Sequence, residues 1–269
     1  MKLIVDCGAT KTVWYLVDGH NGREVQTAGF NLAHTPEPVL HQVLEEAAAA
    51  LGPGIEEVHF YAAGLVGDSP VDLGRWFPGA RIEYASDLVG AARAVCQRES
   101  GIAAIIGTGA NTCQWDGRGI VRTIRCGGFI LGDEGSASVL GRLFVADFLK
   151  ERVPRTLADA FQDRFHADYP TLVKEVYAGA APARYLGSLA PFILSYYPRE
   201  EYAKELVESN FRGLFERTLT RYENLPVGVV GGFGYACRDI LREMAPAYGI
   251  RFSQFLKSPV EGLLQYHGL

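Results

Sequence analysis

The first residues of this chain that could carry out chemistry are an aspartate at the end of a predicted strand and the small residues after it. The apolar run 3–5 leads into Asp6, the sequence Cys-Gly-Ala-Thr-Lys-Thr occupies 7–12, and strand-forming residues resume at 13–17. This pattern predicts a β-hairpin whose tight turn brings backbone N–H groups and hydroxyls to a phosphate chain. An aspartate at the strand end can hold a hydrated Mg²⁺. An ordinary glycine-containing hairpin fits the same pattern.

A second turn of the same design lies about one domain length further along the chain. The apolar run 102–106 is followed by Gly-Thr-Gly-Ala-Asn-Thr at 107–112, and then by a strand that ends in an Asp-Gly turn. We expect two related lobes, each with a phosphate-binding hairpin, to face one nucleotide across a cleft.

Two further segments carry acids at predicted helix starts. Ser86 and Asp87 follow a strand, where either residue type can cap a helix, and where a carboxylate can also take the proton of a hydroxyl during phosphoryl transfer. The segment 132–136, Gly-Asp-Glu-Gly-Ser, places acids at the positive end of a helix dipole. Its glycines would also let the backbone approach a ligand closely.

Asn31 is a turn residue by type. Residues 231–234, Gly-Gly-Phe-Gly, form either a plain strand–helix turn or a loop on which a base or ribose can lie.

The elements that must position these residues are strands and helices in alternation. The pattern predicts a helix at 38–51, core strands at 58–64 and 82–85, and a helix at 87–96. Further on, it predicts a helix at 135–150, helices broken at prolines over 155–223, a strand at 227–230 and a helix at 238–248. Strand clusters interrupted by helices in both halves predict an α/β fold with a mixed sheet in each lobe.

Composition excludes several classes of protein. The 269 residues are 48% hydrophobic and 21% charged, and the net charge of −5 offers no basic footprint for nucleic acid. The chain has no apolar run long enough for a membrane span and no signal-peptide layout, so we expect a cytoplasmic protein. The odd number of cysteines and their apolar neighbours predict reduced thiols. They are Cys7, Cys96, Cys113, Cys126 and Cys237.

Taken in order, these segments resemble the superfamily of sugar kinases, actin and heat-shock chaperone ATPases. Within it, they are most similar to the BadF/BadG/BcrA/BcrD-type ATPases, in the N-acetylglucosamine-kinase-like branch. The resemblance rests on residues 6–12, 31, 86–94, 107–112, 127–137, 230–232 and 257–263. It implies two actin-like (ribonuclease H-like) lobes, each a mixed sheet flanked by helices, with an interlobe cleft. We expect an N-terminal lobe of residues 1–104 together with a C-terminal helix at about 256–269, and a C-terminal lobe of residues 105–255.

The resemblance implies an ATP- and Mg²⁺-dependent kinase of an amino sugar, N-acetylglucosamine or a related cell-wall sugar, with Asp87 as the catalytic base. The expected ATP and phosphate ligands are Gly8, Ala9, Thr10, Lys11, Thr12, Gly107, Thr108, Gly109, Ala110, Asn111, Gly231 and Gly232. The expected sugar ligands are Asn31, Asp87, Thr108 and Asp133. Asp6 would hold Mg²⁺ through water. Glu134 would either bind Mg²⁺ through water or brace its loop, and Lys11 would reach phosphate or lie in solvent.

Other interpretations stay open. An ATPase coupled to a redox or other protein partner would use paired cysteines for an iron–sulfur cluster, for which Cys113 and Cys126 are candidates. A non-catalytic sugar or nucleotide sensor would not need the intact acids Asp6, Asp87 and Asp133. Relatives tend to carry Gly-Ser-Ile-Ala at 231–234, so the nucleotide preference is less defined than the phosphate sites. The resemblance further implies a homodimer.

Overall fold

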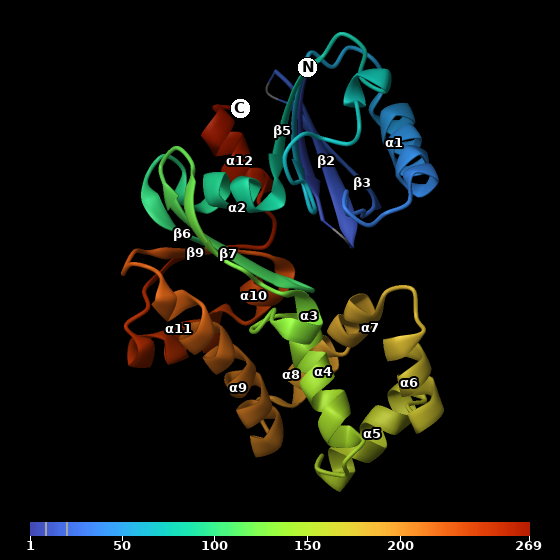
Figure 1. Ribbon diagram of the computed structural model, residues 1–269, viewed down its shortest axis with the longest axis vertical. Coiled ribbons are helices and arrows are strands. Elements are labelled where there is room, and N and C mark those ends of the chain that lie inside the picture. The colour runs from blue at the N-terminus through green and yellow to red at the C-terminus, as the bar shows by residue number, and fades with distance from the viewer. Residues whose placement is uncertain (9, 20) are drawn as a thin grey trace. The chain divides into compact units, whose positions relative to one another are not determined.

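The computed structural model describes residues 1–8, 10–19 and 21–269 (Figure 1). The chain forms two compact units, which are described separately. Unit 1 comprises Met1–Ala103, Trp115–Val121 and Ser258–Leu269, and unit 2 comprises Ala104–Gln114 and Arg122–Lys257. The C-terminal segment thus belongs to the first unit. The short stretch Trp115–Val121 also belongs to that unit, which a single boundary at residue 104 does not anticipate.

The sheet of unit 1 has the strand order β3-β2-β1-β4-β5. The strands are β1 (Lys2–Cys7), β2 (Lys11–Asp18), β3 (Asn21–Ala28), β4 (Glu57–Ala62) and β5 (Arg81–Ser86). β1 to β3 form an antiparallel meander, while β4 and β5 add in parallel to β1. Leu3, Ile4 and Val5 are all fully buried because both faces of the sheet are covered by helices.

Helices pack on the two faces of this sheet (Figure 1). On one face, α1 (Glu37–Leu51) buries Leu40, Val43, Leu44, Ala47 and Leu51 in a cluster with Leu3, Val5 and Trp14. On the other, α2 (Asp87–Cys96) and α12 (Val260–His267) contact each other and β1. The two helices approach closely because Gly262 lies against the backbone of Ala94, where a side chain would not fit. The 3₁₀ turn η1 (Leu73–Arg75) precedes β5.

The second sheet has the order β10-β9-β6-β7-β8. Its strands are β6 (Ser100–Ile106), β7 (Ala110–Asp116), β8 (Ile120–Ile124), β9 (Val227–Val230) and β10 (Phe252–Leu256). Two mixed five-stranded sheets flanked by helices confirm the predicted α/β fold class.

The helices of unit 2 follow the sequence pattern closely. They are α3 (Gly128–Leu131), α4 (Ala137–Phe148), α5 (Arg155–Phe165), α6 (Tyr169–Tyr177), α7 (Pro182–Ser188), α8 (Ala190–Tyr196), α9 (Glu201–Arg217), α10 (Gly232–Ala236) and α11 (Arg238–Met244), with 3₁₀ turns η2 (Leu219–Arg221) and η3 (Ala245–Tyr248). Pro170, Pro182 and Pro191 each lie in the first turn of a helix, where no N–H is needed. Among the described residues, no helix combines the length and the apolarity that crossing a membrane requires.

Candidate functional site

In unit 1, strand register brings two aspartates to one edge of the sheet. Cys7 pairs with Ala62, and Ala62 pairs with Ser86, so β1, β4 and β5 end level with one another. Asp6 is the residue before Cys7, and Asp87 is the residue after Ser86. The Asp87 carboxylate is close enough to raise the pKa of Asp6. The fold thus joins two acids that are far apart in the sequence.

The environment of both aspartates favours the protonated carboxyl. Burial, and then the charge of Asp87, raise the pKa of Asp6 to about 7, while Lys11 acts in the opposite direction. Burial also raises the pKa of Asp87. Two half-buried carboxyl groups that repel each other fit a hydrated Mg²⁺, which prefers oxygen ligands and keeps several waters.

The structure separates the capping role from Asp87. Ser86 is the N-cap of α2, and its hydroxyl accepts a hydrogen bond from the Val89 N–H at 3.3 Å. Asp87 is the first helical residue, and its Oδ1 accepts from the adjacent Leu88 N–H at 2.8 Å. Because Ser86 serves as the cap, the half-buried carboxylate of Asp87 is not explained by helix termination.

The turn between β1 and β2 is closed by its own backbone. The Gly8 N–H donates to the Lys11 carbonyl at 3.1 Å, and the Gly29 N–H donates to the Thr10 carbonyl at 3.3 Å. A Cβ at Gly29 would overlap the backbone of Gly8 and Lys11, so only glycine fits beneath the turn. Ala9, one of the predicted phosphate ligands, lies outside the described residues.

The sequence predicted that Thr12 would bind phosphate, but its side chain lies inside unit 1. Its side chain is fully buried, and its Oγ1 donates to the Cys7 Sγ at 3.4 Å. The Cys7 thiol in turn donates to the Phe30 carbonyl at 3.4 Å. In this structure Thr12 therefore holds the hairpin together from inside, while Lys11 is exposed at the turn.

Asn31 lies at the same sheet edge as the aspartates. Its Oδ1 accepts from the Ala33 N–H at 2.9 Å and packs against Gly64. The Leu32 N–H donates to the Ala63 carbonyl at 3.0 Å, and the Ala63 N–H donates to the Cys7 carbonyl at 2.8 Å. This chain of bonds ties the loop of Asn31 to the end of β1, next to Asp6.

In unit 2, the turn 107–109 rests on the start of a helix. The Gly107 N–H donates to the Gly109 carbonyl at 2.9 Å. The first amides of α4 donate to the turn, from Ala137 to the Gly107 carbonyl at 3.0 Å and from Ser138 to the Thr108 carbonyl at 3.1 Å. The Asn111 Oδ1 accepts from the Thr112 N–H at 2.9 Å. The helix end therefore fixes the position of the turn.

Asp133 lies directly against this turn. Its Oδ2 is 2.8 Å from where a Cβ on Gly109 would stand, and the Cys126 thiol and the backbone of Ala110 and Gly128 act to lower the pKa of its carboxyl. Burial raises the pKa of Asp133 to about 6. Its φ of 54° is in the left-handed region, which a non-glycine residue adopts at a cost of order 1–3 kcal/mol and which is common at functional sites.

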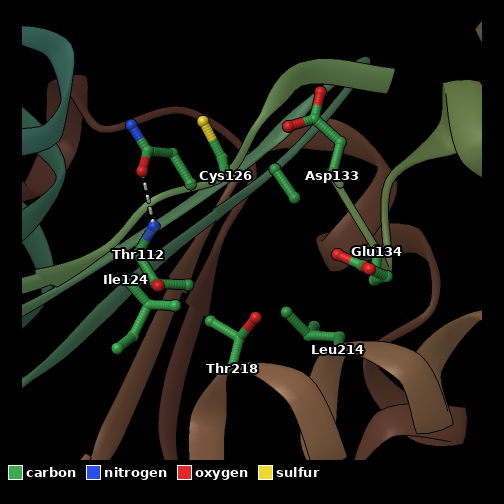
Figure 2. Close-up of a pocket in the computed structure, with 9 residues that line it drawn as sticks. Thr112, Ile124, Cys126, Asp133, Glu134, Leu214 and Thr218 are labelled. Carbon is green, nitrogen blue, oxygen red and sulfur yellow. Dashed lines mark hydrogen bonds between the residues drawn. The ribbon is translucent and has the colours of Figure 1, made fainter. Parts of the chain in front are cut away.

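Glu134 faces a small pocket beside Asp133 (Figure 2). Figure 2 shows Cys126 and Asp133 on one side of this pocket and Leu214 and Thr218 on the other. The Glu134 Oε1 accepts from the Arg217 Nη1 at 3.2 Å. Of the two roles that the sequence left open, this ion pair supports bracing of the loop, and metal binding by Glu134 stays a prediction.

The glycine turn at Gly231 lies beside the turn 107–109 of the same unit. Its φ is 126°, and a Cβ there would lie 2.5 Å from the Ile106 carbonyl oxygen and 3.3 Å from the Gly107 nitrogen. Gly232 has open space around it. In this turn, Phe233 is buried and stacks on Phe211 with ring centroids 5.7 Å apart. Phe233, which differs from the residue that relatives tend to carry there, therefore packs inside unit 2.

Sequence reasoning missed Asn210, which holds the segment after Asp133. Asn210 is 2% exposed, and its Oδ1 accepts from the Gly135 N–H at 2.9 Å while its Nδ2 donates to the Ser136 carbonyl at 3.0 Å. The available signal was a polar residue in the buried stripe of α9, between apolar neighbours such as Val207 and Leu214. A buried amide needs partners, so its position itself indicates a specific contact.

His59, Glu83 and His267 in unit 1 could also hold a metal ion by residue type. The His59 nitrogens face Glu83 at 2.8 Å and Glu57 at 3.2 Å. Hydrogen bonds from His59 and Arg93 lower the pKa of Glu83 to about 2. Both ring nitrogens of His59 face a carboxylate, so the arrangement forms a hydrogen-bond network.

His267, at the end of α12, is neutral in this network. Arg93 donates to the Tyr61 hydroxyl at 2.8 Å, and that hydroxyl lies 2.7 Å from the His267 Nε2. The His267 ring stacks on His59 with centroids 3.6 Å apart. Burial, and then the charge of His59, lower the pKa of His267 to about 4.

The cysteines do not favour an iron–sulfur site. Cys113 is fully buried in β7, and Cys126 is half-buried beside Asp133. Cysteines that share a cluster between two subunits must reach the surface, and Cys113 does not.

Solved structures of known proteins share this fold. A candidate N-acetylglucosamine kinase from Porphyromonas gingivalis has 34% sequence identity and a TM-score of 0.90, over 99% of this chain and 98% of that one. A candidate N-acetylglucosamine kinase from Chromobacterium violaceum has 22% identity and a TM-score of 0.71, over 98% of both chains. A ROK family glucokinase from Streptomyces griseus, in complex with glucose and AMPPNP, has 16% identity and a TM-score of 0.54, over 98% of this chain and 97% of that one. No protein-family model matches the chain, and no curated protein matches it.

The fold and the two glycine turns define a member of the actin-like ATPase superfamily. Within this superfamily the chain belongs to the sugar-kinase family, together with the Porphyromonas gingivalis protein that it matches over almost its whole length. The narrower placement among BadF/BadG/BcrA/BcrD-type ATPases stays a prediction.

Proposed function

We propose that this protein is an ATP-dependent kinase that phosphorylates a hydroxyl of an amino sugar, N-acetylglucosamine or a related cell-wall sugar. The observation that carries the proposal is the pair Asp6 and Asp87, two half-buried carboxyl groups that strand register joins at one sheet edge. Membership of the sugar-kinase family supports the reaction class. The 34% identity to a candidate N-acetylglucosamine kinase supports the choice of sugar.

In this proposal Asp87 orients the acceptor hydroxyl and takes its proton as the phosphoryl group arrives. Its raised pKa supports that role, because a base whose pKa is closer to neutrality transfers protons more effectively. A loose transition state needs little deprotonation, so orientation contributes as well. Asn31, Thr108 and Asp133 would bind the sugar hydroxyls.

ATP would be bound through glycine turns. The proposed phosphate ligands are Gly8, Ala9, Thr10, Lys11, Gly107, Thr108, Gly109, Ala110 and Asn111, with Gly231 and Gly232 near the nucleoside. Mg²⁺, held by Asp6 through water, would neutralise charge on the phosphate oxygens when bound. Lys11 faces Asp6 closely enough to lower the pKa of that carboxyl, which supports its place at the phosphates.

The test is coupled ATP turnover with Mg²⁺ against glucose, glucosamine, N-acetylglucosamine, N-acetylmannosamine and N-acetylmuramic acid. We expect strong stimulation by one amino sugar, with the phosphosugar detected by mass. Slow hydrolysis that is indifferent to every sugar would contradict the proposal and favour a partner-coupled ATPase. A homodimer in the cytoplasm also stays a proposal, and light scattering of the purified protein tests the dimer.

A further inference from the structure

Helix α9 meets the segment of Asp133 through one face. Asn210 bonds to Gly135 and Ser136, a Cβ on Gly213 would stand 3.2 Å from the Glu134 side chain, Leu214 packs on Gly135, and Arg217 pairs with Glu134. The four helix positions are i, i+3, i+4 and i+7, which is one continuous stripe of an α-helix. A single helix face thus contacts three consecutive residues that follow Asp133.

Asn210 supplies the directional part of this contact. Its carbonyl oxygen and its amide nitrogen each bond to a backbone group of the segment, at 2.9 Å and 3.0 Å. The Ser136 carbonyl also accepts from the Leu140 N–H at 3.1 Å as α4 begins. Asn210 therefore connects α9 to the first turn of the helix that carries the turn 107–109.

The segment needs such support because its backbone is strained. Asp133, a non-glycine residue, has a φ of 54°, and two residues later Gly135 has a φ of 85°, which favours glycine at that position. Strained conformations persist only where the surrounding structure determines them strongly. The strain at Asp133 accompanies the placement of its carboxylate against Gly109.

We propose that Asn210 is a positioning residue, which holds Asp133 against the turn 107–109 and thereby sets the affinity for the sugar. This inference rests on the proposed function, in which Asp133 binds sugar. Asn210 itself is buried and acts through the backbone of Gly135 and Ser136.

The experiment compares Asn210→Leu, which removes both hydrogen bonds at similar volume, with Asn210→Asp, which keeps the acceptor for the Gly135 N–H. The control is Val207→Ala, a buried change on the same helix that makes a cavity and breaks no side-chain hydrogen bond. We expect the sugar KM to rise at least ~10-fold in Asn210→Leu and less in Asn210→Asp, with the ATP KM within about twofold of wild type. Val207→Ala should leave both constants unchanged.

Hydrogen exchange on the same variants gives a readout that does not need turnover. Amides of residues 133–136 should exchange at least ~10-fold faster in Asn210→Leu than in Val207→Ala. A wild-type enzyme that phosphorylates no sugar would overturn the proposed function while leaving this readout intact. Unchanged exchange, or an unchanged sugar KM in an active and folded Asn210→Leu protein, would overturn the positioning role.

Discussion

Unit 1 and unit 2 position their candidate site residues by different means. Asp6 and Asp87 are positioned by strand register, since each stands beside the last residue of a strand, β1 or β5, that pairs in parallel with β4. Asp133 is positioned by a strained loop that a distant helix holds through Asn210. The comparison suggests that the first arrangement tolerates changes in its surroundings, whereas the second depends on a few specific contacts.

The largest effect is expected at the sheet edge that carries Asp6 and Asp87. Asp87→Asn should keep ATP and sugar binding but lose at least ~100-fold in kcat, because the proton acceptor is gone while the shape remains. The measurement is steady-state kinetics with binding by calorimetry. Ser86→Ala is the matched control, which removes the helix cap at a cost of about 1 kcal/mol in stability and leaves the carboxylate in place. Turnover like that of wild type in Asp87→Asn would refute the base assignment.

A change at Asp133 should instead act on sugar binding. We expect Asp133→Ala to raise the sugar KM by ~10–100-fold, as expected for the loss of hydrogen bonds to a charged group, with a smaller change in kcat. Since the pKa of Asp133 is raised to about 6, its ionised form is lost as pH falls through that value. The wild-type kcat/KM for sugar should therefore decline below about pH 6. An unchanged sugar affinity in Asp133→Ala would count against this role.

Adjacent glycines in unit 2 offer a matched pair for stability. Gly231→Ala should lower the free energy of unfolding by roughly 2–4 kcal/mol, because the new Cβ meets the Ile106 carbonyl and the φ is 126°. Gly232→Ala has open space and should change stability by less than about 1 kcal/mol. Urea denaturation measures both. Equal stability of the two variants would show that the close approach of the two turns is not required.

The smallest effect is a pH dependence of unit 1. The pKa of His267 is lowered to about 4, so between about pH 6.5 and 4 the unfolded chain binds more protons than the folded one. Stability is therefore fully present above pH 6.5 and falls as pH drops through this window, by about 1–2 kcal/mol for a partly buried group. His267→Gln should flatten this part of the urea-midpoint profile between pH 4.5 and 7.5. His166→Asn, an exposed change in unit 2, should not, and an unchanged profile in His267→Gln would exclude His267 as the cause.

The sequence was most informative where local rules decide structure. The strands around Asp6, the helix that begins at Asp87 and the helices interrupted by Pro170, Pro182 and Pro191 follow from periodicity and backbone restrictions that act over a few residues. The assignment of Trp115–Val121 to unit 1 did not follow from the sequence, because it depends on packing between segments distant along the chain.

The candidate site divides in the same way. Residue type and the small-residue turns marked Asp6, Asp87, Asp133 and the glycines at 107, 109 and 231 from the sequence alone, because acids beside glycine turns are rare where a core must be packed. Tertiary structure alone decided which of these groups meet. It joined Asp6 to Asp87 through the register of three strands, turned the Thr12 hydroxyl inward to Cys7, and placed Asn210 on the backbone beside Asp133. These contacts link residues tens of positions apart, and only the packed sheet and helices determine them.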